Sequence, residues 1–161
     1  MTIAQTTRIY PDESNPGVEV EVTLTNTGSS SMPNVCYGRG NDPDQGKQFG
    51  GSYSTNNKIL YKPGHGSNPA KFAAVEAKSS TYAQIGGVML TDDSRARAGY
   101  GRWDMSDTCR LWDEADAQTV GVTSRGDYQN HLMWKIGTLA AGASTRLKYY
   151  IFAKTSLRLS P

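Results

Sequence analysis

The clearest periodic pattern in the chain is the alternation of apolar and polar residues in "VEVEVTLTNTG", residues 18–28. Val18, Val20, Val22 and Leu24 alternate with glutamates and threonines. A period of two puts one set of side chains on a buried face and the other set in water, so the pattern predicts a half-buried antiparallel strand. The sequence Asn-Thr-Gly at 26–28 predicts a turn that ends this strand.

Short apolar runs between turn-forming residues predict further strands. The runs are "NVCYGR" (34–39, with Pro33 at its edge), "NNKILY" (56–61), "TYAQIGGVML" (81–90), "HLMWKIG" (131–137) and "TRLKYYIFA" (145–153). The run "AKFAAVEA" (70–77) fits a helix or a strand. Gly86 and Gly87 predict a bulge or a close backbone approach, so their strand is expected to be kinked.

Only "SDTCRLWDEADA", residues 106–117, has the composition of a short helix, with Ser106 or Asp107 as its N-cap. Short strands, glycine-rich turns and little helix predict an all-β fold, an antiparallel β-sandwich with long loops and one short helix. The 161 residues contain no visible repeat and fit a single sandwich domain, 1–161.

Charge and hydropathy narrow the classes of partner. The net charge is +2, and lysines and arginines are scattered among acids, so nucleic acid is not an expected partner. No stretch reaches the roughly 18 apolar residues that a membrane span needs. The start of the chain lacks the pattern of a signal peptide, so an extracellular or cell-surface location would require a signal outside this chain.

The two cysteines, Cys36 and Cys109, lie far apart and form no C-x-x-C motif. This spacing excludes a zinc ribbon and a thioredoxin-like site. The pair can form one disulfide or remain as two buried thiols, and the sequence does not decide between these states.

Catalytic motifs are missing. The sequence has two histidines, His65 in a glycine-flanked loop and His131 beside an apolar run, and neither belongs to a known catalytic or zinc motif. No nucleophile and base stand in a recognisable arrangement. We therefore expect a binding protein rather than an enzyme.

The acidic segment "NDPDQ" supplies Asn41, Asp42, Asp44 and Gln45 within five residues. Calcium binds six to eight oxygen ligands, and carboxylates and amides are among those it prefers. Pro43 stiffens the segment, and in an extended chain Asp42 and Asp44 point to the same side. A calcium site is one reading of this segment. The other is a loop whose acids only stabilise turns.

The order of several motifs resembles a known family. "VEVEVTLTNTGSSSMPNVCYGRGNDPDQ", "GGSYSTNNKI", "LTDDSRARAGY" and "RGDYQNHLMWKIGTLAAGAST" follow one another from about Val18 to Tyr150. In this order they resemble the peptide-binding type of β-sandwich domain in large repeat-toxin-like bacterial surface adhesins. The resemblance implies a calcium-dependent pocket that grips a short peptide through its C-terminal carboxylate.

By position, the resemblance assigns roles to named residues. Asp42, Asp44, Gln45 and Asp127 are the implied calcium ligands. The implied ligand-binding or bracing residues are Asn56, Asn57, Arg39, Ser94 and Arg95. The implied partner is a peptide or a cell-surface protein.

Two other classes of function fit the same fold. The first is a structural, self-assembling subunit of a filament, capsid or surface layer, in which the acidic loop holds a stabilising ion or none. The second is a carbohydrate-binding module. Its stacking platform would come from Tyr53, Tyr100, Trp103 and Trp112.

Overall fold

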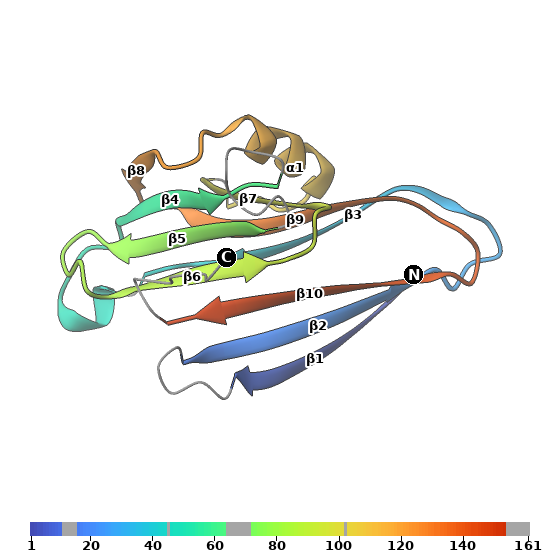
Figure 1. The fold of residues 1–161 in the computed structure, drawn as a ribbon, viewed down its shortest axis with the longest axis horizontal. Coiled ribbons are helices and arrows are strands. Elements are labelled where there is room, and N and C mark those ends of the chain that lie inside the picture. The colour runs from blue at the N-terminus through green and yellow to red at the C-terminus, as the bar shows by residue number, and fades with distance from the viewer. Residues whose placement is uncertain (11–15, 45, 64–71, 102, 154–161) are drawn as a thin grey trace.

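The computed structural model describes residues 1–10, 16–44, 46–63, 72–101 and 103–153 (Figure 1). The strands, in chain order, are β1 (Thr2–Tyr10), β2 (Gly17–Thr25), β3 (Met32–Asn41), β4 (Thr55–Tyr61), β5 (Ala73–Ser79), β6 (Gly86–Thr91), β7 (Ala96–Gly101), β8 (Thr123–Gly126), β9 (Gln129–Leu139) and β10 (Ser144–Phe152). One 3₁₀ turn, η1 (Lys47–Phe49), and one helix, α1 (Thr108–Ala117), interrupt them.

The strands form two antiparallel sheets that face each other, as the sequence predicts. The larger sheet has seven strands in the order β1-β2-β10-β6-β5-β4-β8, and the smaller has three in the order β3-β9-β7. Between them lies a core that includes Val20, Val22 and Leu24 of β2. Three of the four apolar residues of the opening alternation are thus buried and Val18 is partly buried, and the all-β sandwich is confirmed.

Trp134 of β9 lies at the centre of this core and is fully buried. Its ring centroid lies 5.8 Å from that of Tyr37 on β3 and 5.8 Å from that of Tyr149 on β10. Aromatic pairs at this separation add to the free energy that burial alone contributes. These tilted ring contacts therefore link the small sheet to the large one.

The predicted helix, α1, packs on the outer face of the small sheet. Leu111 and Ala115 contact Met133 there, and all three are buried. Asp107 is the N-cap, because its carboxylate accepts a hydrogen bond from the backbone N–H of Arg110 at 2.9 Å. A disulfide joins Cys36 of β3 to Cys109 of α1, which settles the state of the two cysteines that the sequence left open.

Several strand assignments differ from the sequence expectations. The ambiguous run at 70–77 contributes to a strand, β5, over its described residues. The register of β5 with β6 runs unbroken through Gly86 and Gly87, so of the two alternatives predicted at that pair the bulge is wrong. The strands β1, β7 and β8 are additional to those predicted. The loop that holds His65 lies outside the described residues.

One end of the sandwich gathers the termini of many strands. β3 and β9 pair there through Asn41 and Asn130, and β4 and β8 pair through Thr55 and Gly126. β10 finishes at the same end, on the left in Figure 1, where η1 also lies. The loops that connect these strands can therefore bring side chains together from distant parts of the sequence.

Candidate metal centre

Three carboxylates meet at this end of the sandwich. Asp42 and Asp44 follow β3, and Asp127 lies between β8 and β9. Each offers an oxygen, and these oxygens all lie within 4.8 Å of one another. Asp42 and Asp127 are exposed and Asp44 is half-buried. The described residues contain no other group of three or more histidine, cysteine or acidic side chains that is as close.

The backbone explains why the acids converge. Pro43 is buried between Asp42 and Asp44 and fixes φ, which holds the two carboxylates on a short, stiff segment. The backbone N–H of Lys47 donates to the carbonyl of Asp44 at 3.1 Å and turns the chain into η1. The pairing of Asn41 with Asn130 brings the residues before β9 alongside the end of β3.

The raised pKa of the Asp44 carboxyl indicates that nearby positive charge does not balance the negative charge of the cluster. Burial raises the pKa of the Asp44 carboxyl above its ordinary value, and the negative charges of Asp42 and Asp127 raise it further. A hydrogen bond to Asp42 favours the protonated form, and Lys47 opposes these effects only in part. The Oδ1 atom of Asp44 is buried and accepts no hydrogen bond within the described part of the chain.

A cation would relieve this arrangement. Three carboxylates on two loops supply hard oxygen ligands and leave room for carbonyls and water, which suits the irregular coordination of calcium. Zinc and copper favour nitrogen and sulfur ligands, and none stand in this group. Gln45, the fourth ligand implied by sequence, lies outside the described residues.

The strand β4 begins next to the cluster, but its two asparagines pair with residues further from Asp127, Asn56 with Arg125 and Asn57 with Ser124. Thr55 pairs with Gly126, the residue before Asp127, so the first residues of β4 approach the acidic group. Asn57 is fully buried, and its amide donates to the Thr55 carbonyl at 3.1 Å. Asn56 is partly exposed. Asn57 therefore braces its own strand.

The structure does not bring the remaining sequence candidates to the cluster. Burial raises the pKa of the Tyr37 and Tyr149 hydroxyls, and the charge of Arg39 opposes this shift only in part, so the Arg39 guanidinium acts on these phenols. Ser94 and Arg95 follow the far end of β6, where β10 begins.

The Arg95 guanidinium is used within the fold. It donates to Asp93 Oδ2 at 2.6 Å and to Thr145 Oγ1 at 2.9 Å. These bonds tie the loop between β6 and β7 to the start of β10, so the role of Arg95 here is structural.

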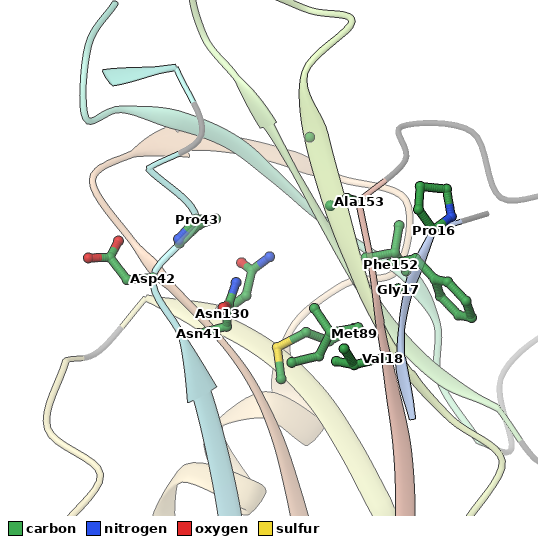
Figure 2. A pocket seen from close by; sticks show the side chains of 14 residues that line it. Pro16, Gly17, Val18, Asn41, Asp42, Pro43, Met89, Asn130, Phe152 and Ala153 are labelled. Carbon is green, nitrogen blue, oxygen red and sulfur yellow. The ribbon is translucent and has the colours of Figure 1, made fainter. Parts of the chain in front are cut away.

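A pocket of about 460 Å³ opens between the two sheets beside the acidic segment (Figure 2). Val18, Met89 and Ile151 are among the apolar side chains of its wall, and Asn41 and Asn130 are polar residues in it. Figure 2 shows the Asp42 carboxylate directed away from the pocket, while Asp42 and Pro43 form part of its rim. The acidic cluster and the pocket therefore share one segment but not one cavity.

Asn130 is a site residue that sequence reasoning missed. It is 2 % exposed, and its Oδ1 atom accepts no hydrogen bond from a described residue. A buried amide oxygen without a donor is costly, so it favours a ligand that can donate. The signal in the sequence was an asparagine directly before the apolar run at 131–137. Gly86 and Gly87 also line the pocket.

The chain matches no protein-family model, no curated protein and no solved structure. Within the described ranges, no helix combines the length and the apolar character that crossing a membrane requires.

Proposed function

We propose that this sandwich is a calcium-dependent, extracellular binding module of the adhesin type. Asp42, Asp44 and Asp127 hold the ion, and Gln45 is a further candidate ligand by its place in the sequence. The observation that carries the proposal is the convergence of three carboxylates within 4.8 Å, with a buried Asp44 oxygen that lacks a described donor. A divalent cation is the simplest group that satisfies these oxygens.

In this proposal the ion acts on the ligand pocket through the backbone. Asp42 and Pro43 belong both to the ion-binding segment and to the pocket rim. Neutralising the carboxylates removes their mutual repulsion, and a loop that repels itself less is held more firmly in one conformation. Calcium thus fixes one wall of the pocket, and removing calcium loosens that wall.

The lining of the pocket favours a peptide as the ligand. Asn130 presents an amide oxygen that can accept a backbone N–H, and the amide N–H groups of Asn41 and Asn130 can donate to a carboxylate. The apolar wall beside them suits one hydrophobic side chain. The matching ligand is a short peptide that ends in a free carboxylate.

The disulfide adds limited support for the location. Disulfides persist mainly in oxidising compartments, so Cys36–Cys109 is compatible with a protein outside the cytoplasm. A catalytic role is not part of the proposal.

The carbohydrate-binding alternative has less support. One of its aromatic residues, Trp112, packs against the Arg97 guanidinium and the Lys135 ammonium and donates its indole N–H to the Arg95 carbonyl. Tyr100 stacks on Tyr128. Trp103 and Tyr53 are each half exposed. The Lys47 ammonium lies 4.3 Å from the centroid of the Tyr53 ring, so three of the four rings are engaged within the protein.

The test is retention of peptides on the immobilised protein. A mixed pool of short peptides with free C-termini, and the same pool amidated, are applied in calcium and then washed with EGTA. We expect free-carboxylate peptides to be retained and EGTA to release them. Equal retention of both pools, or retention that survives EGTA, would contradict the proposal.

Asn41→Asp is the variant for this assay. It keeps the shape of the side chain and puts a negative charge into the pocket, so it should weaken retention of free-carboxylate peptides while leaving the fold unchanged. Asp113→Asn, on an exposed carboxylate of α1, is the matched control.

A further inference from the structure

The strand β1 forms one margin of the large sheet, with a free edge. It pairs with β2 through nine consecutive positions, and no described strand pairs with its other edge. In Figure 1, β1 lies at the lower margin of the molecule, and α1 lies at the top. Eight of its nine residues are exposed. Both faces of this strand and one row of its backbone groups are therefore open to solvent.

This edge lacks the features that keep sheets from joining. Natural edge strands are usually short, bulged, or interrupted by proline or by lysine. β1 has nine residues, an unbroken register with β2, no proline and no lysine. Its single charge, Arg8, pairs with Glu19 at 3.2 Å. The opposite margin of the sheet, β8, has only four residues.

The inner face of β1 carries exposed isoleucines. Ile3 pairs with Leu24 and Ile9 with Val18, so both point to the same side as the core residues of β2. Yet Ile3 is 57 % exposed and Ile9 is 84 % exposed. The apolar inner face of the large sheet thus continues onto β1, where the described residues leave it exposed.

We propose that β1 is a dimerisation edge at which a second copy of this chain pairs antiparallel, about a two-fold axis at Thr6. In this register Ile3 lies opposite Ile9 of the partner subunit, and Gln5 lies opposite Thr7 of the partner subunit. Arg8 faces Ala4 of the partner subunit, so no like charges meet. The strand is self-complementary, as a two-fold interface requires.

The pairing would satisfy the free backbone groups of β1 and cover its exposed isoleucines. Each copy supplies the backbone donors and acceptors that the other lacks, and the two isoleucine pairs cover the inner face at the seam. The two seven-stranded sheets become one continuous sheet. A contact between two strand edges is smaller than a standard protein interface, so the dimer forms with modest affinity and depends on concentration.

The test is sedimentation equilibrium of the full chain over a wide range of concentration, with three variants. Ile3→Lys/Ile9→Lys places lysine opposite lysine across the seam and should weaken dimerisation at least about tenfold. Ile3→Lys/Ile9→Glu places lysine opposite glutamate in this register alone and should recover most of the lost dimer. Val122→Lys, at another exposed apolar residue, should leave the dimer constant unchanged.

All the substituted side chains are exposed, so the variants should keep the melting temperature of the parent chain. A parent chain that stays monomeric at every concentration overturns the proposal. So does a dimer that the double-lysine variant leaves intact, because that dimer uses another surface. Failure of the lysine–glutamate variant to recover the dimer overturns the register.

Discussion

The carboxylates of Asp44 and Asp127 offer oxygens within 4.8 Å of each other, although one residue follows β3 and the other follows β8. Only the folded chain brings these charges together. Folding therefore concentrates negative charge, and that cost must be offset within the fold or by a bound cation.

Asp127→Asn tests whether a bound calcium ion offsets this repulsion. The substitution keeps the shape of the side chain and removes one of the three negative charges. We expect calcium affinity, measured by isothermal titration calorimetry, to fall at least about tenfold, which corresponds to about 1.4 kcal/mol. In calcium-free buffer the variant should be as stable as the parent or more stable, because repulsion at Asp44 is reduced.

The matched control is again Asp113→Asn, an exposed carboxylate that pairs with Lys135 at 3.0 Å. It should bind calcium as the parent does. Equal calcium affinity in Asp127→Asn and the parent would exclude Asp127 as a ligand.

The sequence predicts the residues of this site that lie close together along the chain, and not those that lie far apart. Asp42 and Asp44 stand on either side of a proline, and two residues of extended chain suffice to place them together. Asp127 joins them only because β3 pairs with β9, a contact that no local pattern encodes. Its place in the ligand set came from the family resemblance. Asn130 was missed because its place in the pocket also depends on the pairing of β3 with β9.

The strands, too, divide into those that a local pattern predicts and those that it does not. β2 buries alternate residues, and β10 does so up to Tyr149, so their period of two is visible in the sequence. β1 lies beyond the covering sheet, and its inner positions therefore mix Gln5 and Thr7 with the isoleucines. The buried residues of β7 include Ala96 and Ala98, which are too small to give a strong apolar signal. Tertiary contacts, rather than local preference, define these strands.

A second prediction concerns His131, which is 3 % exposed and whose Nδ1 atom has no described partner. Burial lowers its pKa from 6.5 to about 4, and Glu114 opposes that effect. The folded state holds the imidazole neutral while the unfolded chain takes up a proton below pH 6.5. Stability from this residue is therefore complete above pH 6.5 and is lost as the pH falls toward 4.

The measurement is urea unfolding of the parent and of His131→Gln between pH 7 and pH 4. Over that range the parent should lose more stability than the variant, by a margin on the order of 3 kcal/mol. Subtracting the two curves removes the contributions of the carboxylates and of His65, which both proteins share. Parallel curves would show that His131 does not titrate differently on unfolding.

A third prediction concerns the disulfide, which closes a long loop with a sequence separation of 73 between Cys36 and Cys109. Cross-linking so long a loop restricts the unfolded chain, and removing the link should cost about 3–4 kcal/mol of unfolding free energy. We expect dithiothreitol to lower the urea midpoint of the parent. The Cys36→Ser/Cys109→Ser variant should start at the lower midpoint and should not respond to dithiothreitol. An unchanged midpoint in the reduced parent would contradict this account.

The most direct test of the central claim is the melting temperature in calcium and in EGTA. An ion that binds only the folded state stabilises it by about 2.7 kcal/mol at a concentration one hundred times its dissociation constant. For a domain of this size, that should raise the melting temperature by roughly 5–10 °C. Asp42→Asn/Asp44→Asn should abolish the shift. Identical melting temperatures of the parent in saturating calcium and in EGTA would contradict a calcium site at this cluster.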